Sequence, residues 1–457
     1  MTDPISGKDD KVVATSAVDT ESKVDGHVSL GQADAALEYL HAGEVATFSD
    51  IDEKRLVRKI DWMVVPLMWA IYFLQYLDKI LINYASVMGL LADTGMRTDQ
   101  FSNLALAFYV SYLFFELPTG YFMQRLPTAK YLGMNEQPKR IGFWYLGTGT
   151  ATILGALVAY GLLFYKGDKF YSWQIMFLIF GLITIAVGIT VIVVFPDNPM
   201  KSRLSHEEKL MVIERLRENR TGIENKHFKW EQFFEAFKDP QTYLIAIIVA
   251  SGNISNAAIS SFSALIIKNF GFDTKETELL TIPGGVVSVI SILLGTYLAG
   301  RFDQRCFCII GILCSGLLGG CLMAFAPSDN KGAKLAGNYL TNCVGSALPL
   351  LYSTVGANVA GHTKKVTMNA IVLMAFCLGN ILGPLSFRTE DEPEYMPAKV
   401  AIVATVSVAI VFTVALKCYY IWENQRRDRM CAGLQHEENS EFLDLTDKEN
   451  LEFRYKH

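Results

Sequence analysis

The sequence predicts an all-α membrane protein, and two observations carry this prediction. Of the 457 residues, 51% are apolar, and the mean hydropathy is positive, at +0.26. The apolar residues are also gathered into long runs, most of them near the ~20 residues that a helix needs to cross a bilayer. A soluble multidomain enzyme has neither this composition nor this pattern.

Ten candidate spans, four before a polar stretch and six after it, divide the chain into five parts. Residues 1–60 are polar and are expected to form a cytoplasmic tail that ends in a short charged helix. An N-terminal bundle (61–195), a cytoplasmic linker (196–240) and a C-terminal bundle (241–422) follow. Residues 423–457 form a second cytoplasmic tail, whose acidic last part shows no evident fold. The spans are expected at 62–91, 101–123, 142–164, 173–195, 243–267, 279–299, 306–325, 335–359, 366–387 and 400–421.

Lysine and arginine near the span ends set the expected orientation. Nine basic residues lie in the linker between 201 and 238, and four precede the first span, whereas the alternate loops hold one or two each. Both termini are therefore expected in the cytoplasm, which requires an even number of spans. We expect a multi-pass protein of the plasma membrane, with an internal membrane as the alternative.

The linker contains two helical signals. Ser205 and Glu208 form an S-x-x-E capping box, which is typical of a helix start. The later segment FKWEQFFEAFKDP is rich in aromatic residues and indicates an amphipathic helix on the inner membrane face. This segment is interpreted as a structural connection between the two bundles, with a site for a cytosolic partner as the alternative. Its aromatic residues are Phe228, Trp230, Phe233, Phe234 and Phe237.

The first span holds two formally charged side chains, Asp78 and Lys79, near its middle. An ionised residue at the bilayer centre costs at least ~2.5–3.5 kcal/mol on insertion scales, so it should face a polar cavity or a partner. Neighbours on a helix point about 100° apart and cannot fully shield each other. The pattern favours a substrate and proton site. Mutual neutralisation, or snorkelling outward, is the alternative.

Three further spans carry polar side chains. Glu116, in the second span, is a candidate proton carrier, or else an ion-pair partner that holds the bundle closed. In the fifth span, Asn253, Asn256 and Ser260 share one helical face, which either lines a cavity or forms interhelical hydrogen bonds. Asn380, in the ninth span, lies between glycines where backbones approach closely. It is a candidate substrate contact, although the glycines alone indicate only helix packing.

No motif for enzymatic chemistry is present. The sequence has no Walker lysine loop, no GxSxG elbow and no His/Glu pair at zincin spacing. We therefore expect no enzyme activity, no cofactor and no metal, and the Cys306-x-Cys308 pair lacks a nearby histidine. No basic tract with interleaved aromatics points to nucleic acid. The expected partners are a small organic anion, protons and the lipid bilayer, with the chain as a monomer.

Several motifs resemble those of the fungal allantoate permease family, the anion:cation symporter branch of the major facilitator superfamily. LDKILINYA in the first span is similar to the family signature L-D-R-x-N-I-x-N-A, and LGNILGP followed by EDEPEY is similar to G-N-I-I-G-P and D-A-P-x-Y. The resemblance runs from about Lys59 to Arg429 in the appropriate order. Further matches are ELPTGYFMQRLPTAKYLG, EQPKRIGFWYLGTG, FSALIIKNFGF with LLTIPGG, and ANVAGHTKK.

This resemblance implies the major facilitator fold, with two helical bundles around a central cavity, and proton-driven symport of a small carboxylate such as a ureido acid or a vitamin acid. Asp78 matches the acidic residue implicated in proton coupling. Lys79 stands where the family usually has arginine and would receive the substrate carboxylate, as a point charge and not as a bidentate fork. Asn83 and Asn380 match motif asparagines and are expected in the substrate site.

One departure from the family is large. Where the family continues into its third and fourth helices, this chain passes from Asn135 directly to Glu136. Two spans and their turn, on the order of fifty residues at about 20 per span, are missing. Either an exon has been skipped, or the protein is truly shortened. The missing helices leave an inactive or sensor form as one alternative to symport. Because the same fold transports in both directions, an exporter of a fungal metabolite or detoxification product is another alternative.

Overall fold

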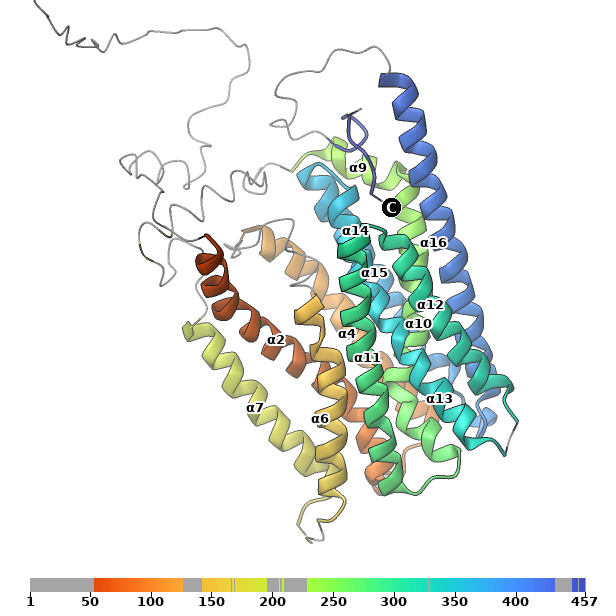
Figure 1. The fold of residues 1–457 in the computed structure, drawn as a ribbon. Coiled ribbons are helices and arrows are strands. Elements are labelled where there is room, and N and C mark those ends of the chain that lie inside the picture. The colour runs from red at the N-terminus through yellow and green to blue at the C-terminus, as the bar shows by residue number, and fades with distance from the viewer. Residues whose placement is uncertain are drawn as a thin grey trace, which may run out of the picture. The chain divides into compact units, whose positions relative to one another are not determined.

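The computed structural model describes residues 53–125, 142–194, 228–431 and 446–456, except 166, 168, 328 and 451, together with Ser205 and Glu208. These residues belong to one compact unit, Thr47–His457. Within the described ranges every regular element is a helix, and no strand is present (Figure 1). The prediction of an all-α protein is confirmed.

The N-terminal half consists of long helices that begin near the predicted spans. The first span continues as one helical unit through a π-helical turn at Gly89, whose φ of 116° only glycine adopts easily, and it ends at Gly95, with φ of 65°. The helices are α2 (Glu53–Ala85), η3 (Ser86–Leu90), α3 (Leu91–Thr94), α4 (Thr98–Arg125), α6 (Gly147–Leu162) and α7 (Ser172–Val194).

The C-terminal half begins with a short helix and continues with long ones. Asp239 caps α10 by accepting a hydrogen bond from the backbone N–H of Gln241, and Pro240 stands at the first helical position, where its missing N–H costs nothing. The helices are α9 (Trp230–Lys238), α10 (Pro240–Asn269), α11 (Thr274–Phe302), α12 (Arg305–Phe325), α13 (Lys331–Thr341), η5 (Asn342–Ser346), α14 (Ala347–Asn358), α15 (His362–Leu382), η6 (Pro384–Ser386), η7 (Thr389–Asp391) and α16 (Met396–Cys431).

Eight helices of the described residues are long and apolar enough to cross a membrane. The other two expected spans correspond to α4 and to the broken helix formed by α13, η5 and α14, which are helical but do not meet that measure. The count of ten therefore stays a prediction. The arrangement of four helical units before the linker and six after it follows the predicted order.

The two halves of the described unit pack against each other mainly through three pairs of long helices, α6 with α11, α4 with α15, and α2 with α10. We call the first of these the α6–α11 seam. There Gly149 and Gly285 face each other so closely that a Cβ on Gly149 would lie 2.7 Å from the carbonyl oxygen of Gly285. Only glycine permits this approach of two backbones.

The linker signals behave as predicted where the structure describes them. The backbone N–H of Ser205 donates to Glu208 at 2.9 Å, and the Glu208 N–H donates to the Ser205 hydroxyl at 3.2 Å, which completes the capping box. The amphipathic segment forms α9. Trp230 and Phe234 of α9 are exposed, whereas Gln232 is buried against the C-terminal half. The aromatic face is thus free for the membrane interface.

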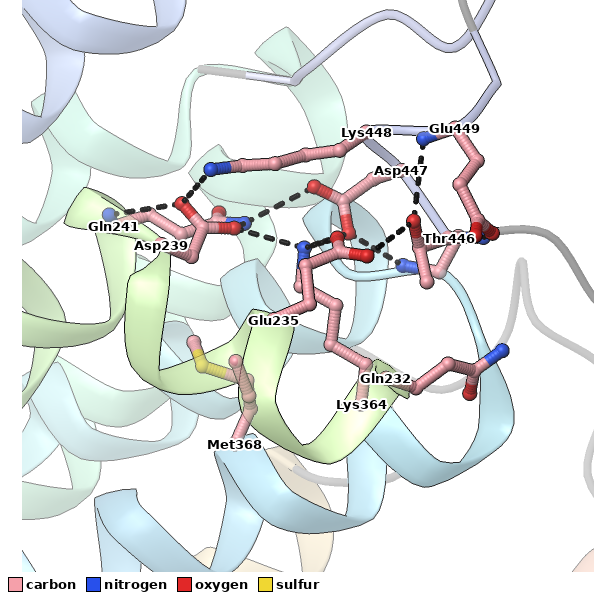
Figure 2. Close-up of polar contacts among 12 residues, drawn as sticks. Gln232, Glu235, Asp239, Gln241, Lys364, Met368, Thr446, Asp447, Lys448 and Glu449 are labelled. Atoms are coloured by element: carbon pink, nitrogen blue, oxygen red, sulfur yellow. Dashed lines mark hydrogen bonds and ion pairs between the residues drawn. The ribbon is translucent and has the colours of Figure 1, made fainter. Parts of the chain in front are cut away.

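The expectation that the last part of the chain has no fold is wrong for residues 446–456. Thr446 and Asp447 are fully buried, and so is Tyr455, whose hydroxyl donates to Asp447 at 2.6 Å. Burial and the neighbouring Asp447 carboxylate raise the pKa of Tyr455 above its ordinary value. Lys364 of α15 meets Asp447 of this segment and two carboxylates, one from α9 and one from the start of α10 (Figure 2). The segment also docks on α16, where the Arg427 guanidinium donates to the Tyr455 hydroxyl at 3.0 Å. We call residues 446–456 the C-terminal clamp.

Candidate functional site

Asp78 and Lys79 line one cavity of about 340 Å³ in the N-terminal half. Such a volume lies at the lower end of the range for small-molecule sites. Its walls come from α2, η3, α4, α7 and Ser261 of α10. The structure therefore places a hollow beside both charges of the first span, as the cost of burying them requires.

Lys79 lies in this cavity with aromatic neighbours and no acidic one. Its ammonium nitrogen is 5.3 Å from the ring centre of Tyr76 and 5.2 Å from that of Tyr109. Within the described part of the chain, Lys79 makes no ion pair and no hydrogen bond. Two ring faces attract a cation, by about 0.5–1 kcal/mol each at partly exposed sites, but they do not neutralise it. A positive charge remains available to an anion.

Asp78 lines the same cavity as Lys79, but no ion pair joins the two side chains. Thr184 of α7 donates a hydrogen bond to the Asp78 carboxylate at 3.2 Å. The Asp78 side chain is exposed. Mutual neutralisation of the pair is therefore not what the side chains do in this structure.

The rest of the cavity wall is largely apolar. Phe108 of α4 and Phe177 of α7 contribute ring surface, and Trp173 donates its indole N–H to Asp93 at 3.0 Å. A charged group on a low-dielectric wall acts more strongly on a ligand than the same group in water. This arrangement can hold a small molecule that has one anionic end and an apolar body.

Asn83 lies apart from this cavity, on a second and much smaller hollow between the two halves. The hollow has about 20 Å³ for water-sized occupants, which is room for about one molecule. The Asn83 side-chain oxygen accepts a hydrogen bond from the backbone N–H of Ala264 at 3.1 Å. Polar groups from both halves surround the hollow, among them Tyr84, Ser260 and Thr281.

The remaining candidate asparagines form hydrogen bonds within their own helices. Asn253 donates to the carbonyl of Val249 at 2.7 Å, and Asn256 donates to the side chain of Asn253 at 3.3 Å. Asn380 donates to the carbonyl of Phe376 at 2.7 Å, and its own oxygen has no partner among the described residues. None of the three lines either hollow. These hydrogen bonds join residues three or four apart in one helix, and neither the cavity role nor the interhelical hydrogen bond is seen among the described residues.

The sequence did not predict two features of the site, and the side chain of one candidate residue is not described by the structure. Glu116 belongs to α4, but its side chain lies outside the described residues. Tyr76 and Tyr109 flank Lys79 from two helices, a pairing that no single helix reveals. Glu278, fully buried in α11, stands one residue before the predicted span. The capping box of Asp273 and Glu276, which begins α11 earlier, was the signal that could have included it.

Comparison with known proteins gives a consistent result. Residues 128–384 match the Major Facilitator Superfamily. An uncharacterized transporter of Schizosaccharomyces pombe is 34% identical, over 94% of this chain and 94% of its own. The allantoate permease of Saccharomyces cerevisiae is 33% identical, over 92% and 90%. The thiamine pathway transporter THI73 of the same yeast is 32% identical, over 91% and 89%.

A solved structure and the alignment lengths add two facts. A bacterial homologue of the human lysosomal transporter Spinster, in an inward-facing and unoccupied state, has a TM-score of 0.51 at 13% identity, over 78% of this chain and 96% of its own. The alignment with the fission-yeast transporter covers 484 positions, of which about 430, or 94% of 457, are residues of this chain. About 54 positions therefore face gaps here, a number that agrees with two missing spans.

Proposed function

The chain belongs to the major facilitator superfamily as a relative of the allantoate permease, and on that premise we propose that this multi-pass secondary transporter imports a small organic anion together with protons. Transport of a small molecule follows from the family. The anion, the proton and the roles of Asp78 and Lys79 are the proposal. It includes a plasma-membrane location with both termini in the cytoplasm, and a monomer as the working unit.

The observation that carries the proposal is the environment of Lys79. Its ammonium group faces a cavity of about 340 Å³ and meets aromatic rings, with no carboxylate of the described chain within ion-pair distance. A cation in a low-dielectric site without a counter-ion is costly. An incoming carboxylate supplies the missing partner and offsets that cost. A neutral or cationic solute does not.

Charge balance favours a proton as the co-transported ion. With Asp78 ionised and Lys79 protonated, the cavity has a formal charge of zero. A monovalent anion changes this to minus one, and a proton on Asp78 restores zero. Moving an unbalanced charge through a low-dielectric core costs much free energy. The conformational change of the transporter therefore has its lowest barrier when both the anion and the proton are bound. The expected stoichiometry is one proton for each monovalent anion.

The test is uptake into vesicles that contain the purified 457-residue chain. Radiolabelled allantoate is the first probe, because a relative is named for it, and a panel of small carboxylates follows. One pH unit of inward gradient should concentrate a monovalent anion up to about tenfold. Asp78→Asn and Lys79→Gln should abolish this accumulation. Lys275→Gln, which removes an exposed lysine on α11, is the matched control and should leave it intact.

Uptake that does not depend on the proton gradient would contradict proton coupling. Neutral analogues that are taken up as fast as carboxylates would contradict the anion site.

A second candidate, a form that does not transport, is favoured by one observation. The alignment gaps agree with a missing helix pair, and the cavity wall is completed by few polar groups. A bundle without two helices lacks part of its packing. Comparing the 457-residue chain with a version that restores the missing stretch from the fission-yeast relative decides between the two. Activity in the restored protein alone would support the second candidate.

A further inference from the structure

A buried carboxyl group lies away from the cavity of Asp78 and Lys79. Glu278 is in the second turn of α11 and has no exposed surface. Neither of its carboxyl oxygens has a hydrogen-bond partner in the part of the chain that the structure describes, and no ion pair reaches it there. The hydroxyl of Thr277 beside it is also buried without a partner.

Glu278 belongs to the α6–α11 seam. Gly285, where α6 comes closest, lies seven residues further along α11 and so on the same helical face. Thr281, one turn from Glu278, lines the small polar hollow between the two halves. The titratable side chains that line the same hollow from other helices are Tyr76 and Tyr84 of α2 and Tyr339 of α13. The Tyr84 hydroxyl donates to the carbonyl of Thr152 at 2.9 Å.

The charged neighbours of Glu278 on its own helix point elsewhere. Lys275 is exposed, and its ammonium lies 4.2 Å from the ring centre of Phe164. Glu276 is exposed and caps the start of α11. Glu278 is buried from water, and no cation among the described residues reaches it. An ionised carboxylate in such a position is among the most expensive arrangements in a protein interior. The neutral acid costs far less.

We propose that Glu278 is a second proton-binding site, which is protonated while the α6–α11 seam is closed and releases its proton when the seam parts and admits water. By linkage, a proton that binds the closed seam more tightly than the open one favours closure. Closing the seam therefore requires a proton on Glu278. The role in coupling rests on the proposed transport function, whereas the proton linkage of the seam does not.

The experiment compares backbone hydrogen exchange of the seam in the purified full chain and in Glu278→Gln, which imitates the protonated acid. Both proteins are measured at the same pH, so the intrinsic pH dependence of exchange cancels. At about pH 5 the seam peptides of α6 and α11 should exchange at equal rates. At about pH 8 they should exchange at least about fivefold faster in the wild type, the lower end of typical coupling energies.

Glu276→Gln is the matched control. It makes the same change two residues away on an exposed side chain, and glutamine can still complete the capping box. This variant should follow the wild type at both pH values. Lys79→Gln should also show the wild-type pH dependence of hydrogen exchange in the seam. A failure of the proposed anion site at Lys79 can therefore be distinguished from a failure of the proposed proton site at Glu278.

A second measurement detects the proton itself. Dicyclohexylcarbodiimide, an apolar reagent that modifies protonated carboxyl groups, should label the Glu278 peptide at about pH 5, and the label should be absent in Glu278→Gln. Equal exchange of wild type and Glu278→Gln from about pH 5 to pH 8 would overturn the proposal. So would seam peptides that exchange faster in Glu278→Gln at every pH, because an ionised and paired Glu278 would produce that result.

Discussion

Lys364 and Lys79 are both lysines within the helical unit, and they are held in opposite ways. The ammonium of Lys364, fully buried, meets Glu235 at 2.8 Å, Asp239 at 2.8 Å and Asp447 at 2.7 Å. That of Lys79 meets two aromatic rings more than 5 Å away. The part of the chain that the structure describes supplies three anionic partners for Lys364 and none for Lys79. The difference separates a structural cation from one that can receive a ligand.

The environment of Lys364 explains why it joins distant parts of the chain. Glu235 comes from α9, Asp239 from the start of α10 and Asp447 from the C-terminal clamp, and the three meet at one ammonium group (Figure 2). Gln241 donates to Asp239 at 2.7 Å and to Asp447 at 3.2 Å, so the carboxylates are held by more than charge. A buried ion cluster with satisfied hydrogen bonds fixes one arrangement of its segments.

Removing Lys364 should produce the largest effect. Lys364→Met leaves three carboxylates without their shared cation, and breaking a buried pair from one side costs about 3–5 kcal/mol. We expect a loss of this size in the free energy of unfolding of the purified protein, with release of the C-terminal clamp seen as rapid hydrogen exchange in 446–456.

The neighbouring lysine provides the control for that change. Lys365 donates one hydrogen bond to the carbonyl of Gly356 at 2.9 Å, so Lys365→Met should cost only about 1 kcal/mol. If the two variants lose equal stability, the cluster around Lys364 is not what holds the clamp.

Acid should loosen the clamp by a smaller amount. Burial alone would raise the pKa of Asp239, but the Lys364 ammonium and the hydrogen bonds from Lys364 and Gln241 hold that pKa below its usual value of 3.8. Because the folded pKa is the lower one, the stabilisation is complete above about pH 4 and is lost as the pH falls through the lowered folded pKa. Hydrogen exchange of 446–456 should therefore rise below that pH.

Asp239→Asn removes the group that titrates and provides the reference for the acid experiment. Its clamp should exchange faster than the wild-type clamp at neutral pH and show a weaker acid-dependent increase. A clamp that stays protected in the wild type down to about pH 2 would contradict the assignment of this carboxylate.

Removing Lys79 should cost much less stability than removing Lys364. Lys79→Met loses two cation–ring contacts and leaves no carboxylate behind, so the free energy of unfolding should change by no more than about 1–2 kcal/mol. Anion uptake should nevertheless disappear. A loss of stability as large as that of Lys364→Met would mean that Lys79 has a structural anionic partner, and the contrast between the two lysines would fail.

The membrane helices and the charged residues of the first span could be predicted from the sequence, because both depend on local composition. Long apolar runs need no partner to be recognised, and Asp78 and Lys79 stand out within one of them. The clamp was missed because the residues that bury its polar segment, among them Lys364 and Arg427, come from other parts of the chain. Glu278 was missed because a charged residue beside an apolar run looks like a loop residue unless the helix start is placed first.

For the asparagines, the sequence predicted a role in the site that the structure does not show. Asn253, Asn256 and Asn380 have the spacing of a cavity-lining stripe, yet their hydrogen bonds go to backbone carbonyls and to one another. Spacing defines a helical face but not what that face meets. The packing of α10 against α15 decides it, and that packing depends on how six helices are arranged.

Equilibrium binding of radiolabelled allantoate and of a carboxylate panel to the purified chain tests the central claim most directly, with wild type and Lys79→Gln compared at the same pH. We predict that the wild type binds at least one of these anions and that Lys79→Gln binds it at least about tenfold more weakly, since one tenfold step corresponds to about 1.4 kcal/mol. Equal affinity of the two proteins, or no binding of any carboxylate by the wild type, would contradict an anion site at Lys79.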